Sequence, residues 1–159
     1  MMRRILSILL VILVSGCITG NAGGGEMSVK KGDHVFVHYT GTLDDGVQFD
    51  SSEGRDPLEF DVGAGQMIKG FDSAVIGMKA GEEKTVRIEA EDAYGMTDKN
   101  LIIDVPKSQV PDAKAGDTLY SRDQPVKVVS VGSDTVKIDF NHPLAGKALT
   151  FRIKLVKIG

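Results

Sequence analysis

The sequence predicts an α+β protein in which a curved antiparallel β-sheet wraps one short helix, with a small antiparallel β-unit inserted in the chain. Three observations support this prediction. Apolar and polar residues alternate in several short segments, which is typical of strands with one buried face. Only residues 67–78 carry apolar side chains at helical spacing. The alternation resumes near the C-terminus, after a middle segment with short strands of its own.

The first strands lie on either side of a tight turn. Residues 35–42 alternate and predict a strand, and the Asp45-Gly46 pair that follows predicts a hairpin turn, because glycine readily adopts positive φ. Residues 47–52 form the returning strand, and residues 57–62 alternate again. We interpret the two histidines of this region, His34 and His38, as surface residues rather than metal ligands.

Residues 67–78 predict the helix, which the glycines at positions 77 and 81 limit. Its apolar residues recur on one face: Phe71, Ala74, Val75 and Met78. A sheet with one apolar face needs such a helix as a cover. The next strand is expected over residues 84–90, with three inward side chains, Val86, Ile88 and Ala90.

The middle segment, residues 96–141, reads as a compact unit with one helical turn at 107–110. Its strands are predicted at residues 101–105, 118–121, 126–131 and 135–140. A small sheet of this size is marginal alone and would depend on its host. The host sheet is completed by residues 149–155, and a phase shift at residues 156–158 predicts a bulge or the strand end.

The N-terminal residues 1–16 predict a signal peptide. An apolar run over residues 5–14 follows two arginines, and it is too short for a transmembrane helix, which needs roughly 20 residues. Small residues precede the only cysteine, Cys17, and resemble the lipobox of prokaryotic lipoproteins. Residues 17–27 are rich in glycine and predict a flexible linker.

We therefore expect cleavage before Cys17 and a lipid on its thiol, which would hold the protein at the cell membrane, facing outside the cytoplasm. The alternatives are a signal peptide with an incidental cysteine, an uncleaved anchor, or a cytosolic product that starts at Met27. With one cysteine no internal disulfide can form. The net charge of −3 argues against nucleic-acid binding. Separately, we expect the protein to be a monomer.

Ordered motifs then suggest a family. They are Val37-His38-Tyr39-Thr40-Gly41, Gly46-Val47-Gln48-Phe49-Asp50-Ser51-Ser52, Pro57-Leu58-Glu59-Phe60, Gly65-Gln66-Met67-Ile68-Lys69-Gly70-Phe71, Gly77-Met78-Lys79-Ala80-Gly81-Glu82, Ala93-Tyr94-Gly95 and Asn141-His142-Pro143-Leu144-Ala145-Gly146, with Leu149-Thr150-Phe151 after them. This series resembles the FKBP-type peptidyl-prolyl isomerases, especially SlyD-like and archaeal members with an inserted chaperone domain. The resemblance implies an isomerase domain from residues 28–95 and 142–159, interrupted by a chaperone-like domain at 96–141.

The same resemblance implies an enzyme that accelerates rotation about Xaa-Pro bonds in unfolded or partly folded proteins, without cofactor or metal. An apolar pocket would bind the twisted imide better than the planar one. Tyr94 would hold a substrate carbonyl, and Asp50 would accept a hydrogen bond, oriented by Tyr39. By position, the catalytic residues are Tyr39, Phe49, Asp50, Met67, Ile68, Phe71, Tyr94 and Phe151, and the substrate-binding residues are Leu58, Phe60, His142 and Leu144.

Periodicity alone favours a plainer interpretation, in which these aromatic residues are ordinary core residues. Phe71 stands where many single-domain members have tryptophan, and Met67 where a branched aliphatic residue is common, which leaves macrolide inhibitors open as ligands. The insert would hold unfolded chains through apolar side chains, or only pack its own core. The alternative function is a non-catalytic, peptide-binding lipoprotein on the same fold.

Overall fold

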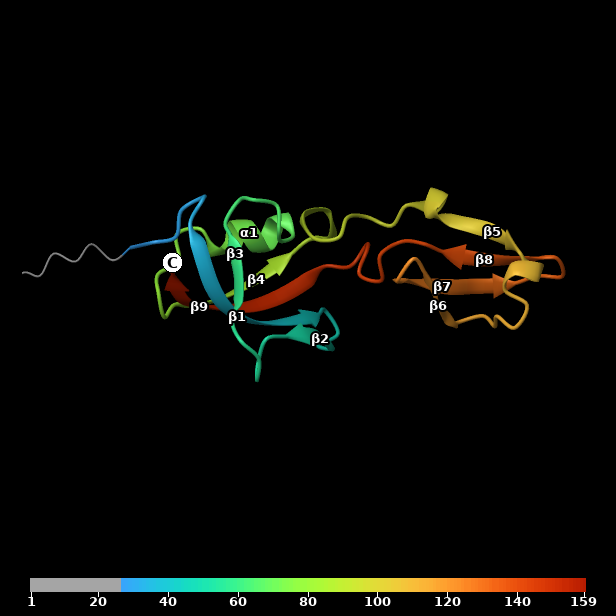
Figure 1. Cartoon of the computed structure of the whole chain (residues 1–159), viewed down its shortest axis with the longest axis horizontal. Helices are drawn as coiled ribbons and strands as arrows, with labels where there is room; N and C mark the ends of the chain where they lie inside the picture. The colour runs from blue at the N-terminus through green and yellow to red at the C-terminus, as the bar shows by residue number, and fades with distance from the viewer. Residues whose placement is uncertain (1–26) are drawn as a thin grey trace, which may run out of the picture.

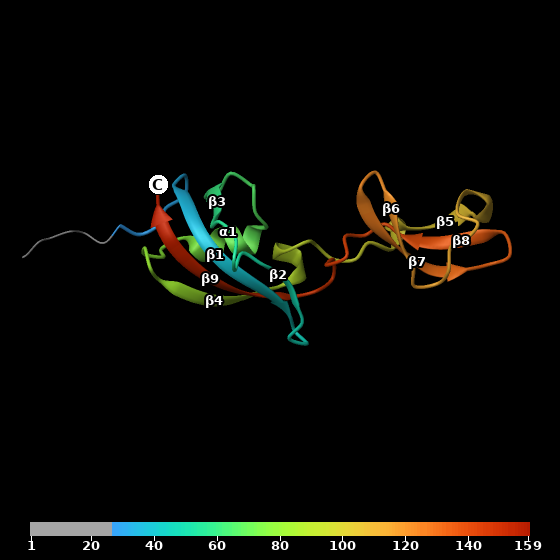
Figure 2. The same cartoon turned by 60° about the horizontal axis from the view of Figure 1, so that its bottom comes forward.

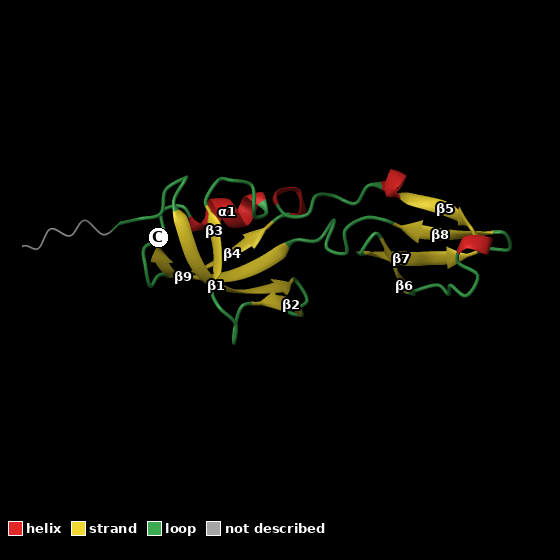
Figure 3. Ribbon diagram, in the orientation of Figure 1, coloured by secondary structure: helices red, strands yellow, loops and turns green. Residues whose placement is uncertain are grey.

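The computed structural model describes residues 27–159 and confirms the predicted fold class. These residues form two antiparallel sheets and one α-helix, which lie as shown in Figures 1 and 3. The predicted signal peptide, the lipid attachment at Cys17 and almost all of the linker fall on residues 1–26, outside the described residues. Within residues 27–159 no helix is long and apolar enough to cross a membrane.

The first sheet has five strands, and the last strand of the chain lies near its centre. The order is β2 (Gln48–Ser51), β1 (His34–Leu43), β9 (Leu149–Ile158) and β4 (Glu83–Ile88), and β3 (Leu58–Asp61) also pairs with β1. One edge of β1 is therefore shared: its first half pairs with β3 and its second half with β2. The β1–β2 turn has Gly46 at φ 84°, as the Asp45-Gly46 pair predicted.

The predicted irregularity near the end of β9 is a bulge. Phe36 pairs with Lys157 and Val37 pairs with Leu155, so Val156 is an extra residue on β9. The buried side chains Leu149, Phe151, Ile153 and Leu155 alternate before the bulge and face the helix side of the sheet. Figure 2 shows the sheet curving around the helix.

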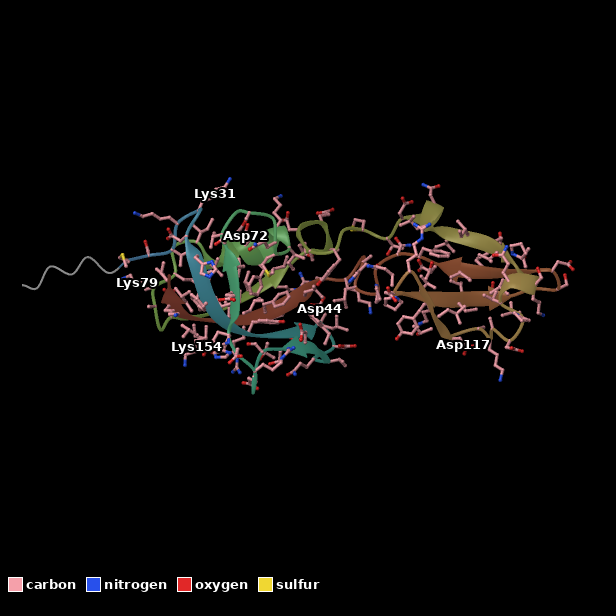
Figure 4. The ribbon with its side chains drawn as sticks, viewed as in Figure 1. Lys31, Asp44, Asp72, Lys79, Asp117 and Lys154 are labelled. Carbon is pink, nitrogen blue, oxygen red and sulfur yellow. The ribbon has the colours of Figure 1, made fainter. Side chains whose placement is uncertain are left out.

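The helix α1 (Lys69–Val75) is shorter than the residues 67–78 that its spacing predicted. The chain extends at Ile76 and turns at Gly77, whose φ is +83°, so the helix ends there, although Met78 stays buried in the same core. Gly70 faces Ile88 of β4 so closely that a Cβ would clash with it. Asp72, labelled in Figure 4, accepts a hydrogen bond from the backbone of Gly63 and ties α1 to the loop after β3.

The strand β4 ends at Ile88, two residues earlier than predicted. Ala90 begins a short 3-10 helix, Ala90–Asp92, and its side chain is nonetheless buried. The expectation that the strand continues to Ala90 is therefore wrong, while its inward direction is confirmed. At the start of the described chain, Val29 is buried and hydrogen-bonds with the backbone of Gly77 and Met78.

The second sheet is formed by the middle segment. Its order is β5 (Ile102–Pro106), β8 (Thr135–Asp139), β7 (Gln124–Val131) and β6 (Thr118–Ser121), with 3-10 turns at Lys99–Leu101 and Lys107–Gln109. It has a core of its own, made of Val126, Val128, Val136 and Ile138. Figure 1 shows two chain segments joining it to the first sheet. The boundaries at residues 96 and 141 stay a prediction.

Candidate active site

An aromatic cluster lies between the first sheet and α1, with Phe151 of β9 at its centre. The ring centroids of Phe151 and Phe71 are 5.1 Å apart, and the ring planes meet at 81°. For Phe151 and Phe49 the centroid distance is 5.6 Å and the interplanar angle is 87°. The Tyr39 ring centroid lies 6.1 Å from that of Phe151 and 5.8 Å from that of Phe71. Edge-to-face contacts of this kind are the favoured arrangement of aromatic pairs, so the cluster has a defined geometry.

The strands fix the directions of these rings. Tyr39 shares a face of β1 with the buried residues Val35 and Val37, since alternate residues of a strand point the same way. Gly41 lies two positions further on that face, where a Cβ would stand 2.6 Å from Phe49 Cζ and 3.0 Å from Phe151 Cε1. Only glycine therefore leaves room for both rings. The sequence motif contains Gly41, but the site prediction did not.

A carboxylate closes one side of the cluster. The Tyr39 hydroxyl donates a 2.5 Å hydrogen bond to Asp50 Oδ2, and the Arg55 guanidinium donates a 2.9 Å bond to Asp50 Oδ1. Arg55 also donates to the Ser51 carbonyl. The sequence reasoning missed Arg55, because it lies beyond the turn at Gly54, where no periodic pattern marks it. The only available signal was its opposite charge, five residues after Asp50.

The electrostatics of the pair fix its protonation state. The hydrogen bond from Tyr39 lowers the pKa of Asp50, and the Ser51 amide and Arg55 act in the same direction, against the effect of desolvation. Burial, followed by the interaction with Asp50, raises the pKa of Tyr39 to about 12. At neutral pH the pair is therefore a phenol donating to a carboxylate.

The remaining predicted residues lie around this cluster at different depths. Phe60 is 2% exposed and packs under Phe71, with ring centroids 5.9 Å apart. Tyr94 is 41% exposed and stacks on His142. Four apolar residues are partly buried against the same core: Leu58, Met67, Ile68 and Leu144. The structure thus brings five of the predicted aromatic residues together, with Asp50 bonded to one of them, Tyr39, while Tyr94 stacks on His142; the five are Tyr39, Phe49, Phe60, Phe71 and Phe151.

The two histidines of β1 are bound to neighbours. His34 Nδ1 lies 2.6 Å from Asp61 Oδ1, and His38 Nδ1 lies 3.1 Å from Ser52 Oγ. Both residues are partly exposed, and 42% of the His34 side chain is accessible. Among residues 27–159 no group of three or more histidine, cysteine, aspartate or glutamate side chains is arranged to hold a metal ion.

Fold and site together define an α+β protein whose curved sheet and short helix enclose an aromatic cluster with one phenol–carboxylate pair at its side. The family model described as FKBP-type peptidyl-prolyl cis-trans isomerase matches residues 25–156. The chain belongs to this family.

Three similar proteins carry related descriptions. A short-type peptidyl-prolyl cis-trans isomerase of Methanocaldococcus jannaschii is 40% identical, over 80% of this chain and 92% of that protein. SlyD, an FKBP-type peptidyl-prolyl cis-trans isomerase of Escherichia coli K12, is 37% identical over 83% of this chain and 71% of its own length. A probable FKBP-type 16 kDa isomerase of Pseudomonas fluorescens is 31% identical, over 84% and 93%.

Proposed function

We propose that this isomerase accelerates rotation about Xaa-Pro bonds in unfolded or partly folded proteins, and that the aromatic cluster with Tyr39 and Asp50 is its active site. The observation that carries the proposal is the 2.5 Å hydrogen bond between these two residues, at the side of a cluster of edge-to-face rings. It places one phenol–carboxylate pair beside the apolar rings of Phe71 and Phe151.

The chemistry requires no bond to be made or broken. Rotation about a peptide bond crosses a barrier of roughly 18–20 kcal/mol, because it interrupts the resonance of the planar amide. The twisted imide has lost that resonance and is less polar than the planar form. An apolar surrounding therefore disfavours the planar form more than the twisted one, and this differential binding lowers the barrier.

Individual residues take different parts in this proposal. Phe71 and Phe151 form the apolar floor on which the proline ring would lie. Tyr39, held by Asp50, keeps the rings beside it in one arrangement. Tyr94 is exposed, and its hydroxyl would donate a hydrogen bond to a carbonyl of the substrate. The residues that would line the sides are Phe49, Leu58, Phe60, Met67, Ile68 and Leu144.

We further propose that the second sheet holds unfolded chains. Two features support this: it exposes large apolar side chains, and within residues 27–159 its outer strands β5 and β6 each have one edge that no other strand pairs with. The exposed side chains include Leu101 next to β5, Ile103, Tyr120 and Val129, with Tyr120 76% exposed. Extended peptides can bind such edges by strand addition.

The location and the ligands are proposals that depend on the sequence. Lipid attachment at Cys17 would place the protein at the outer side of the cell membrane. The test is Cys17→Ser, which should release the protein from membranes into the soluble fraction. Unchanged partitioning would argue against lipidation.

Macrolide inhibitors are candidate ligands of the aromatic cluster. Calorimetric titration of the protein with a macrolide would show whether it binds.

A proline-limited refolding assay tests the proposed activity. The chain starting at Met27 keeps Val29 in the core and is suitable for it. We expect catalytic amounts to accelerate the slow, proline-limited phase. If the chain binds the unfolded substrate without accelerating this phase, the alternative of a non-catalytic binding protein is correct.

A further inference from the structure

Tyr94 and His142 form the closest aromatic contact in the described part of the chain. Their ring centroids are 3.9 Å apart and the rings are 2° from parallel. The imidazole is held from a second side as well, because His142 Nδ1 accepts a 3.1 Å hydrogen bond from the Leu144 backbone N–H. A ring nitrogen that accepts a hydrogen bond carries no proton. The neutral imidazole therefore has one fixed orientation, with its face against the phenol.

Asn141, the residue before His142, attaches the segment 141–146 to the stretch of chain that follows Tyr94. Asn141 is 9% exposed, and its side-chain amide pairs with the backbone of Asp98 in both directions. Asn141 Oδ1 accepts from the Asp98 N–H at 2.9 Å, and Nδ2 donates to the Asp98 carbonyl at 2.9 Å. Nδ2 also donates to the Asp139 carboxylate at 2.7 Å, where β8 ends. All polar atoms of this buried amide are thus satisfied within the junction.

A second hydrogen bond joins the same two segments of the chain. The Gly146 N–H donates a 2.8 Å hydrogen bond to the carbonyl of Gly95, the residue after Tyr94. Gly146 has φ +73°, and a Cβ there would stand 2.6 Å from Thr97 Oγ1. The segment 141–146 is therefore fastened to the chain after Tyr94 at two points, Gly95 and Asp98, and His142 lies between its two attached residues, Asn141 and Gly146.

We propose that His142 is a positioning residue for Tyr94, and that the buried amide of Asn141 sets the place of His142. This inference rests on the proposed function, in which the Tyr94 hydroxyl binds the substrate. An exposed tyrosine would otherwise change rotamer freely. The stack restricts it, so the hydroxyl meets the substrate carbonyl without first being ordered. His142 then acts through Tyr94, and not as the substrate contact that its place in the motif suggested.

The closing experiment is a double-mutant cycle on the turnover of a short Xaa-Pro peptide by the full chain. His142→Ala should lower kcat/KM by roughly fivefold, the scale of one aromatic pair. In a Tyr94→Phe background, which keeps the ring but lacks the hydroxyl, His142→Ala should cause no further loss. His142→Phe keeps a stacking ring and should restore most of the activity. An equal loss in both backgrounds, or no recovery in His142→Phe, would overturn the proposal.

A second measurement tests the positioning role of His142 without an activity assay. The sequence has three histidines, so the His142 ring protons are readily assigned by NMR. They should lie upfield of their positions in Tyr94→Ala, since the phenol face covers them. Asn141→Ala should abolish this displacement, and Asn100→Ala, an exposed asparagine on the same junction, should not. If wild type shows no displacement, the positioning role is wrong. If wild type shows it but has no isomerase activity, only the proposed function fails.

Discussion

The Tyr39 hydroxyl is hydrogen-bonded to the Asp50 carboxylate across the β1–β2 hairpin, although the two residues are not register partners. Asp50 pairs with Gly41 in the ladder, so the contact runs diagonally, past the glycine that leaves room for Phe49 and Phe151. The hairpin, the glycine and the aromatic cluster therefore form one unit.

We expect the replacement of Asp50 to have a larger effect on the rate of isomerisation than on the stability of the fold. Asp50→Ala removes the acceptor of the Tyr39 hydroxyl and the partner of Arg55. A hydrogen bond to a charged group contributes roughly 1.5–3 kcal/mol. Since Asp50 is partly exposed, we expect about a tenfold loss of kcat/KM on a short peptide. Asp56→Ala, an exposed aspartate in the next loop, is the control. Equal activity of Asp50→Ala and the control would contradict the role of Asp50.

Gly41→Ala should disturb the aromatic cluster. The added methyl would stand 2.6 Å from Phe49 Cζ, so the ring must move. Overpacking of this kind typically costs about 1–3 kcal/mol. We expect urea unfolding to show that loss and peptide turnover to fall with it. The double variant Gly41→Ala/Phe49→Leu should recover part of the stability, because the smaller side chain makes room. No recovery would mean that the destabilisation has another source.

The Tyr39–Asp50 pair should make a pH-independent contribution to stability over a wide range. The pKa of Asp50 is lowered, so its contribution is present above the unfolded-state value and is lost as pH falls through the folded one. The pKa of Tyr39 is raised to about 12, so its contribution is present below about pH 10 and is lost towards pH 12.

Urea unfolding of wild type and Tyr39→Phe across pH measures this contribution. The difference between their free energies of unfolding should be constant from about pH 5 to 9. Above about pH 10 the difference should decrease, because the tyrosine ionises in the unfolded state before it does in the folded one. Below about pH 4 it should decrease as well, because Asp50 becomes protonated. A difference that changes between pH 5 and 9 would show that the pair is not a phenol–carboxylate pair over that range.

Removing the second sheet should separate the two proposed activities. Ile102 and Asp139 are register partners, so an Asn-Gly turn in place of residues 103–138 joins them as a hairpin and keeps the Asp98–Asn141 contact. Turnover of a short peptide should be retained. Catalysis of protein refolding should fall by roughly tenfold or more, because the substrate is no longer held near the site. Equal loss on both substrates would contradict a division of labour.

Much of the fold could be predicted from local patterns. The Asp45-Gly46 turn, the alternating strands and the phase shift that became the bulge at Val156 all follow from the backbone geometry of a few neighbouring residues. The helix was predicted too long, because Met78 is buried after the chain has already turned at Gly77. Burial and helical continuity are different properties, and the spacing of apolar residues reports only the first.

The candidate site was less accessible to the same reasoning. Periodicity could not tell Tyr39 or Phe151 from core residues, and it was the family motifs that named them. Arg55 and the Tyr94–His142 stack were missed, since each depends on where a loop returns in space. Gly41 belongs to one of the motifs, but only the structure shows why glycine is required there: the Phe49 and Phe151 rings leave no room for a Cβ.

The most direct test of the account is NMR exchange spectroscopy on a short peptide with one Xaa-Pro bond, with substoichiometric protein added. We expect exchange cross-peaks between the cis and trans forms in wild type, where the uncatalysed interconversion takes tens to hundreds of seconds and gives none. The cross-peaks should weaken strongly in Asp50→Ala. If the peptide resonances shift on binding but no exchange appears in wild type, the aromatic cluster binds prolyl peptides without catalysing their isomerisation, and the central claim is wrong.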